Sequence, residues 1–247
     1  MLKNVIRTKE ETIQYLCELR KWLDEVKDTP VEEMSDFFTQ RITEYDKIHL
    51  EHWANEYKHI SDFFEDSLSI LLDIGCGTGL EFEAIYKRFP NVKITGVDLS
   101  VSMLNEIRKK YPEKEIELIN ADYFQYPFEA GKYDAAMSFE TLHHFEYDKK
   151  QRIYDKIYKA LKNSGYYIEC DYIACCDEEE RLCLEGYEYR RKKHNIPNDA
   201  FVHIDIPLTL WHQFELLKKA GFPSIAVLYM NKGTVIIKAT KCENEKK

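Results

Sequence analysis

This sequence predicts an α/β fold whose mainly parallel sheet is covered by helices on both faces. From about residue 69 onward, short apolar runs typical of buried strands alternate with amphipathic segments typical of helices. A glycine-rich turn follows the first of these runs, and two strand-like segments near the C-terminus flank a hairpin turn. At 247 residues, of which 44% are hydrophobic, the chain can bury such a core without disulfides or metals.

Residues 1–60 are predicted to form a helical extension that leads into the sheet domain, residues 61–247. The first helix begins at a capping box, Thr8-x-x-Glu11, in which each residue can bond the backbone N–H of the other. A second helix is expected to start at Thr29-Pro30, because proline suits the first helical position. The helical pattern of apolar residues then resumes from Phe37 to Ile60, and these helices precede the first strand.

The sheet domain alternates strands and helices in the order that a parallel sheet requires. Strands are expected at 71–74, 91–97, 115–119, 133–139 and 165–172, and helices at 79–89, 101–111 and 148–162. A last helix over 211–220 is stopped by Gly221, and strands at 224–230 and 234–240 form a closing hairpin.

Residues 173–208 interrupt this alternation with an acidic run, a basic run and two prolines. Long connections of this kind at the ligand-bearing end of an α/β sheet are often functional. The segment is therefore predicted to be a lid-like insertion over the ligand site.

The turn after the first strand is the most informative motif, and it reads Asp73-Ile74-Gly75-Cys76-Gly77-Thr78-Gly79. Glycine permits positive φ and close approach of a ligand, and a turn that enters a helix leaves backbone N–H groups facing a pocket. Leu80 stands where a dinucleotide fingerprint has its last glycine, which argues against nicotinamide cofactors. Taken alone, the glycines also suit a tight strand-to-helix turn without any ligand.

The ends of the next two strands supply the context for this turn. Asp98 follows Gly79 by 19 residues (98 minus 79), the distance expected for a carboxylate that binds both hydroxyls of a ribose. Asp122 and Tyr123 end the third strand segment, where an acid and an aromatic ring could lie near an adenine. All three strand ends should meet at one edge of the sheet.

In this order, the motifs resemble those of the class I S-adenosylmethionine-dependent methyltransferases. The resemblance covers roughly residues 60–240, and its motifs are at 72–79, 96–100, 120–122 and 133–145. It implies a Rossmann-like, seven-stranded mixed sheet with a terminal antiparallel hairpin. More loosely, Phe37-Phe38, Arg41 and Tyr45-Asp46 resemble the lead-in helix of small bacterial methyltransferases often named by analogy with transfer-RNA wobble-uridine modifying enzymes.

The resemblance implies S-adenosyl-L-methionine as the cofactor and assigns roles along the sheet edge. The glycine loop would hold the methionine carboxylate and amino group, Asp98 the ribose, Leu99 and Met103 the adenine face, and Asp122 the adenine amino group. The residues expected to contact the cofactor are Arg41, Tyr45, Asp73, Gly75, Cys76, Gly77, Asp98, Leu99, Met103, Asp122, Tyr123 and Ser138.

Methyl transfer mainly requires positioning and a dry site, so catalytic residues are few. His143 and His144 are the candidate catalytic residues, because an acceptor that carries a proton needs a general base near neutral pKa; either could instead only shape the loop. Tyr172, His203 and Asp205 are the candidate acceptor contacts, although the latter pair also suits a polar strand edge. The sequence predicts no metal site.

The composition limits which kinds of binding partner and which cellular location we expect. A formal net charge of −9 disfavours a large nucleic-acid surface, while the basic run 190–194 leaves nucleic acid open as an alternative. The chain has no apolar stretch suited to a signal peptide or a membrane span. Seven cysteines without regular spacing, including Cys170, Cys175-Cys176 and Cys183, indicate reduced thiols in a cytoplasmic protein rather than disulfides or a zinc site.

We therefore expect a methyltransferase that acts on a small-molecule acceptor. Two alternatives stay open: a transfer-RNA-modifying methyltransferase, and a non-catalytic regulatory protein that binds S-adenosylmethionine. The sequence carries no signal for an oligomeric state.

Overall fold

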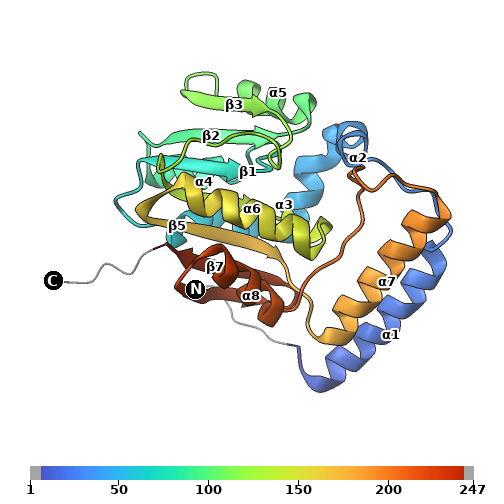
Figure 1. The fold of residues 1–247 in the computed structure, drawn as a ribbon. Coiled ribbons are helices and arrows are strands. Elements are labelled where there is room, and N and C mark those ends of the chain that lie inside the picture. The colour runs from blue at the N-terminus through green and yellow to red at the C-terminus, as the bar shows by residue number, and fades with distance from the viewer. Residues whose placement is uncertain (1–6, 242–247) are drawn as a thin grey trace.

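The computed structural model describes residues 7–241, which form a seven-stranded mixed sheet between helical layers (Figure 1). The strands are β1 (Ile70–Ile74), β2 (Lys93–Asp98), β3 (Ile116–Asn120), β4 (Tyr133–Phe139), β5 (Leu161–Tyr172), β6 (Ser224–Asn231) and β7 (Thr234–Thr240). Their order is β3-β2-β1-β4-β5-β7-β6; β1 to β5 pair in parallel, and β7 pairs antiparallel with both β5 and β6. This confirms the predicted fold class and its terminal hairpin.

Helices cover both faces of the sheet. They are α1 (Lys9–Val26), α2 (Met34–Gln40), α3 (Ile42–His59), α4 (Phe82–Arg88), α5 (Val101–Lys110), α6 (Tyr147–Ala160), α7 (Asp177–Lys193) and α8 (Leu210–Ala220), with short 3-10 turns η1 (Ile60–Phe63) and η2 (Leu142–His144). Buried residues of α6 and α8 pack on one face, and those of α3, α4 and α5 pack on the other. Within the described part of the chain, no helix combines the length and apolar character needed to cross a membrane.

The strand order reverses direction at β1, because β2 and β3 lie on one side of it and β4 and β5 on the other. In an open α/β sheet, ligands bind at such a switch point, beyond the carboxyl ends of the strands. Here that position lies between the ends of β1, β2 and β4, which are buried from Leu71 to Ile74 and from Ala135 to Phe139. Continuous burial holds these strand ends rigidly beneath the site.

The N-terminal helices differ partly from the expectation. The capping box between Thr8 and Glu11 is present at the start of α1, as predicted. The predicted helix start at Thr29-Pro30 is wrong, because α2 begins four residues later with Glu33 as its cap. The Glu33 side chain accepts from two backbone N–H groups, and its backbone bridges Val202, which keeps the preceding residues extended.

The insertion at 173–208 contains the long helix α7 followed by an extended strap over 201–208. In Figure 1, α7 and α1 lie side by side at the edge of the molecule, beyond the sheet. Tyr15 of α1 donates to Glu179 of α7 at 2.5 Å and lies 2.6 Å from the Tyr172 hydroxyl. The N-terminal extension and the insertion therefore form one packed unit.

The basic run at the end of α7 is engaged in contacts within this unit. Arg190 donates to the Thr29 side chain at 3.1 Å, and Lys193 pairs with Asp28. Arg191 donates to the carbonyl groups of Pro197 and Ala200. Cations at a helix C-terminus also stabilise the helix dipole, so this run has a structural role.

Asp134 clamps the start of β1, and this contact leads to a first prediction. Its Oδ2 accepts from the N–H groups of Ser69 at 3.1 Å and Ile70 at 2.8 Å, while Oδ1 pairs with Lys162 at 2.6 Å. Asp134→Ala should lower the free energy of unfolding by about 1–3 kcal/mol, because two backbone donors lose their acceptor. Lys162→Ala, which removes only a partly exposed ion pair, should cost about 1 kcal/mol or less. Urea denaturation measures both, and equal losses would contradict the assignment.

Candidate functional site

The loop after β1 has the backbone geometry of a ligand cradle. Gly75 and Gly77 have φ values of +69° and +49°, which L side chains rarely adopt. A Cβ on Gly75 would overlap the Thr141 side chain, and one on Gly77 would lie 3.3 Å from the Tyr45 hydroxyl. The Gly75 N–H donates to Val97 at 2.8 Å, so the loop is anchored to the end of β2. Conformation favours glycine at both positions, and at Gly75 space also excludes a side chain.

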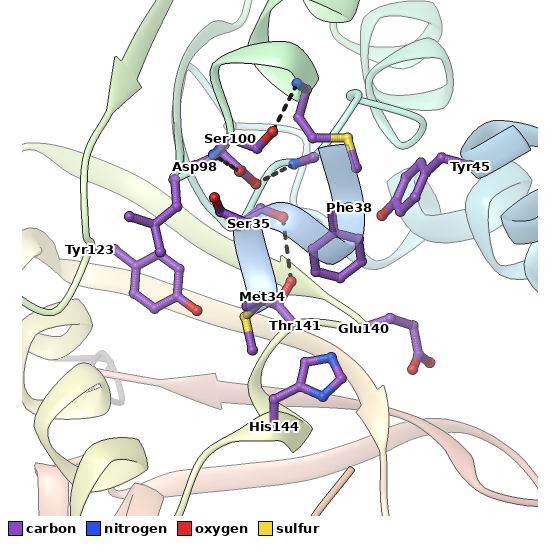
Figure 2. Close-up of a pocket in the computed structure, with 14 residues that line it drawn as sticks. Met34, Ser35, Phe38, Tyr45, Asp98, Ser100, Tyr123, Glu140, Thr141 and His144 are labelled. Carbon is purple, nitrogen blue, oxygen red and sulfur yellow. Dashed lines mark hydrogen bonds between the residues drawn. The ribbon is translucent and has the colours of Figure 1, made fainter. Parts of the chain in front are cut away.

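A cavity opens above this loop at the switch point, with about 550 Å³ of empty space that is partly open to solvent. Its lining residues are Met34, Ser35, Phe38, Tyr45, Gly75, Gly77, Asp98, Leu99, Ser100, Met103, Tyr123, Glu140, Thr141 and His144. Figure 2 shows Asp98 and Ser100 at one end of this cavity and Glu140 and His144 at the other. We call it the cofactor cavity.

Asp98 is fixed at the end of β2 by two backbone donors. Its Oδ2 accepts from Gly77 at 3.0 Å, and its Oδ1 accepts from Ser100 at 2.7 Å. Burial raises the pKa of this carboxyl, and these two N–H groups oppose the rise. Ser100 in turn caps α5 by accepting from Met103 N at 3.4 Å. One turn of chain therefore places a carboxylate, a hydroxyl and an apolar side chain on the same cavity wall.

A second cavity of about 1120 Å³ adjoins the first and shares Phe38, Glu140 and His144 with it. It is lined by Phe38, His49, His52, Trp53, Glu140, His143, His144, Tyr172, His203, Asp205, Asn231, Lys232, Gly233 and Thr234. These residues come from α3, the loop after β4, the strap and the β6–β7 turn. We call it the acceptor cavity.

His143 is held in the wall of the acceptor cavity by Asp171. The His143 Nδ1 lies 2.5 Å from Asp171 Oδ1, and Asp171 also accepts from Leu142 N at 3.0 Å and Tyr172 N at 2.9 Å. Burial lowers the pKa of His143, but the carboxylates of Asp171, Asp205 and Glu140 outweigh it and raise the pKa to about 9. His143 therefore carries a proton at neutral pH and cannot accept another.

His144 differs from its neighbour. Its Nδ1 lies 3.1 Å from Asp205 Oδ1, and it lines both cavities. Burial and the nearby charge of His143 lower its pKa, so its imidazole is neutral at neutral pH. His203 is also neutral because burial lowers its pKa to about 3, and its ring stacks on Phe37 with 3.5 Å between centroids. Of the expected catalytic pair, only His144 is available as a proton acceptor.

The structure brings together most of the residues expected from the sequence. Tyr45, Gly75, Gly77, Asp98, Leu99, Met103 and Tyr123 line the cofactor cavity, and Tyr172, His203 and Asp205 line the acceptor cavity.

Five expected cofactor contacts are not part of the cavity lining. Arg41 turns to Glu32, with which it forms two hydrogen bonds of 3.0 and 2.9 Å. Cys76 packs its thiol into the core beneath the loop, and Ser138 bonds Tyr167 at 2.6 Å inside the sheet layer. Asp122 caps its own loop by accepting from Phe124 N at 2.8 Å. Local capping, pairing or core packing explains each of these departures.

Asp73, the fifth, is buried behind the glycine loop rather than in the wall of the cavity. Burial and the adjacent Glu81 raise its pKa well above the usual range. Its Oδ2 and the Oε1 of Glu81 are buried without a hydrogen-bond partner. Two unpaired carboxyl oxygens beneath a loop that faces a cavity are a site where a cationic group would be stabilised.

Several lining residues were not predicted from the sequence. Met34, Ser35, Ser100, Glu140 and Thr141 line the cofactor cavity, and His49, His52, Trp53 and the β6–β7 turn line the other. Phe38, His49 and Trp53 belong to an aromatic stripe that the sequence analysis included in the helical pattern. Ser100, Glu140 and Thr141 lie within the motifs at 96–100 and 133–145, and this position is the signal that could have found them.

Comparisons with known proteins agree with this geometry. A family model described as "Methyltransferase domain" matches residues 71–165, which include the glycine loop and the ends of β2 and β4. These matches support a class I S-adenosylmethionine-dependent methyltransferase. Carboxy-S-adenosyl-L-methionine synthase of Nautilia profundicola is 24% identical over 224 residues, 83% of this chain and 94% of that protein.

One further relative supports this assignment, and one solved structure supports the fold. Malonyl-[acyl-carrier protein] O-methyltransferase of Priestia megaterium is 36% identical over 105 residues, which cover 42% of this chain and 37% of that one. The structure of human N-acetylserotonin methyltransferase in complex with S-adenosylmethionine matches with a TM-score of 0.63 at 19% identity, over 96% of this chain and 68% of that chain. The methyltransferase fold thus extends across the described chain.

S-adenosyl-L-methionine is the cofactor of this methyltransferase, and the cofactor cavity fits it. The glycine loop leaves no room for a Cβ, Asp98 offers a carboxylate at the wall, and Leu99, Met103 and Tyr123 supply apolar surface. This is the combination of apolar lining and few polar groups typical of small-molecule sites.

A matched pair of glycine substitutions tests the cradle. Gly75→Ala should weaken binding of S-adenosylhomocysteine at least tenfold, because its Cβ displaces Thr141 from the cavity wall. Gly131→Ala is the control: Gly131 has nearly the same φ, +66°, but nothing lies within 4 Å of its Cβ position. Both variants therefore carry a similar backbone strain of about 1–2 kcal/mol. Calorimetric titration should separate them, and equal affinities in folded protein would refute the cradle.

Proposed function

We propose that this methyltransferase transfers a methyl group to a small molecule bound in the acceptor cavity. The observation that carries the proposal is the junction of the two cavities at Phe38, Glu140 and His144. A methyl donor in one cavity and an acceptor in the other can meet only there. Holding both reactants in contact, away from water, is most of what this transfer requires.

The cofactor cavity suggests a role for each of its walls. We propose that Asp98 binds the ribose hydroxyls, since it ends β2 and faces the cavity. Leu99, Met103 and Tyr123 would enclose the adenine. The glycine loop, with the unpaired carboxyl oxygens of Asp73 and Glu81 behind it, would hold the charged methionine end.

When bound, S-adenosylmethionine supplies a methyl group already activated by its sulfonium. The chain's own residues then have to orient the acceptor and receive any proton that it releases. His144 lines both cavities and is neutral, so it is the group placed to take that proton. His143, charged beside Asp171, would instead stabilise negative charge on an acceptor.

The acceptor cavity favours a small, ring-containing molecule. Trp53, Tyr172 and His203 contribute flat side chains. Two acidic side chains, Glu140 and Asp205, and the basic side chain of Lys232 also line the wall. The relatives named for malonyl-[acyl-carrier protein] and carboxy-S-adenosylmethionine also point to acceptors other than nucleic acid. The basic run of α7, engaged within the protein, gives little support to the transfer-RNA alternative.

We further propose that the N-terminal helices and the insertion 173–208 together cover the acceptor cavity. The strap is tied down on both sides: Ile206 N donates to His143 O at 2.8 Å, and His203 N donates to Glu32 O at 3.2 Å. Its mobility as a lid stays a prediction of the sequence. A cytoplasmic location is likewise proposed, in keeping with the six free cysteines of residues 7–241.

The decisive experiment incubates the protein with isotopically methyl-labelled S-adenosylmethionine and fractionated cell metabolites, followed by mass spectrometry. We expect S-adenosylhomocysteine and one labelled small molecule. Label found only in RNA would favour the transfer-RNA alternative, and no turnover with any fraction would favour the regulatory one. Formation of a heavier cofactor derivative without S-adenosylhomocysteine would indicate chemistry like that named for the carboxy-S-adenosylmethionine synthases.

Trp53 offers a test of the acceptor cavity once the acceptor is known. It lines only that cavity, and its indole N–H donates to Thr234 at 3.0 Å across the opening. Trp53→Ala should raise KM for the acceptor at least tenfold, because a large apolar contact is lost, and leave the affinity for S-adenosylhomocysteine unchanged. His59→Ala, a surface change at the end of the same helix beside Asp62, is the control. An unchanged KM in Trp53→Ala would place the acceptor elsewhere.

A further inference from the structure

Three possible metal ligands converge on one wall of the acceptor cavity. His143 Nε2 lies 3.6 Å from Asp205 Oδ1, and His144 Nδ1 lies 3.1 Å from the same oxygen. One ligand atom from each of the three residues lies within 4.8 Å of the other two. His143 and His144 come from η2 and Asp205 from the strap, so two separate segments build the cluster.

These separations suit a single bound ion. Nitrogen and oxygen ligands bind zinc at about 2.0–2.2 Å, so ligands on adjacent positions of one ion are about 3.0–3.5 Å apart. The two measured separations, 3.1 and 3.6 Å, are close to that range. Small side-chain rotations suffice to bring the three atoms around an ion.

His143 is oriented as a metal-binding histidine usually is. Its Nδ1 is bonded to Asp171, whose side chain is 1% exposed and also accepts two backbone N–H groups. A carboxylate on one ring nitrogen fixes the tautomer and directs the other nitrogen toward the metal. Nε2 of His143 is thereby directed toward Asp205 in the wall of the cavity.

Glu140 supplies an independent observation. Its side chain is only 4% exposed, it lines both cavities, and its Oε1 has no hydrogen-bond partner. Its backbone also adopts φ = +46°, an unfavourable conformation for a non-glycine residue that tends to occur at functional sites. Glu140 Oε2 lies 3.8 Å from His143 Nδ1, whereas Oε1 is a buried oxygen without a partner beside the cluster, where a bound cation would stabilise it.

We propose that His143, His144 and Asp205 bind one divalent transition-metal ion in the wall of the acceptor cavity. Two imidazoles and one carboxylate suit Zn²⁺ or Fe²⁺ better than Mg²⁺ or Ca²⁺, which prefer oxygen ligands. Three protein ligands leave a coordination position open toward the cavity, as in metal sites that bind a substrate. At that position the ion would hold an oxygen or nitrogen of the acceptor. This role rests on the proposed function, but the binding of the ion does not depend on it. The two histidines would then act as ligands instead of proton carriers.

Calorimetry with Zn²⁺ on chelator-treated, tag-free protein tests the site directly. We expect one ion per chain with a micromolar or lower Kd, and no comparable binding of Mg²⁺. Co²⁺ should give visible absorption bands of an ion with nitrogen and oxygen ligands. Asp205→Asn keeps the side-chain shape but removes the charge, and it should weaken Zn²⁺ binding at least tenfold and abolish the Co²⁺ bands. His212→Ala, which removes a histidine paired with Glu180 away from the cavity, should change neither measurement.

Two outcomes would overturn the inference: no Zn²⁺ bound at one ion per chain, or unchanged binding and spectra in Asp205→Asn. The labelled-methyl screen, run with chelator and with Zn²⁺, separates this result from the proposed function. Methyl transfer that proceeds fully in chelator, with no ion bound, removes the metal and keeps the methyltransferase assignment. Ion binding without any methylated acceptor keeps the metal site and contradicts the proposed methyl transfer to a small molecule.

Discussion

The buried pair between the Asp171 carboxylate and the His143 imidazole holds the wall that the two cavities share. Asp171 ends β5 and accepts from Leu142 N, so it ties the loop after β4 to the neighbouring strand. Glu140 and His144 are carried by the same loop and therefore stay at the switch point of the sheet. Without that carboxylate, an imidazole and two N–H donors would lose their partner inside the protein. The junction of the cavities thus depends on one side chain that is not itself in contact with the cofactor cavity.

The parts of the site that the sequence predicts are those built from local signals at strand ends. The glycine loop requires positive φ directly after a strand, and Asp98 ends the next strand at a fixed distance along the chain. These constraints act over about 20 residues, so they can be read without knowing how distant segments pack. The alternation of strands and helices predicts the sheet for the same reason.

Contacts between distant segments explain what the sequence does not reveal. Met34 enters the cofactor cavity because its backbone N–H bonds Phe201, more than 160 residues later. The motif around Arg41 predicts a contact with the cofactor. In the structure, however, the Arg41 guanidinium donates a hydrogen bond to the Glu32 carboxylate. Glu140 has strand residues before it and looks like a strand-end acid, but its left-handed backbone conformation is visible only in three dimensions. Pairings of this kind depend on tertiary geometry that no periodicity encodes.

The contact between Tyr15 and Tyr172 has a consequence for transplanting the acceptor specificity into a related enzyme. Tyr172 lines the acceptor cavity at the end of β5, and its hydroxyl lies 2.6 Å from that of Tyr15, close to Glu179. A chimera that exchanges only the insertion after β5 would remove Glu179 and place both hydroxyls against a foreign helix. The N-terminal helix and the insertion form one structural unit, although more than 140 residues separate them in the chain. Transferring both segments together into a related enzyme would preserve the contacts that shape the acceptor cavity.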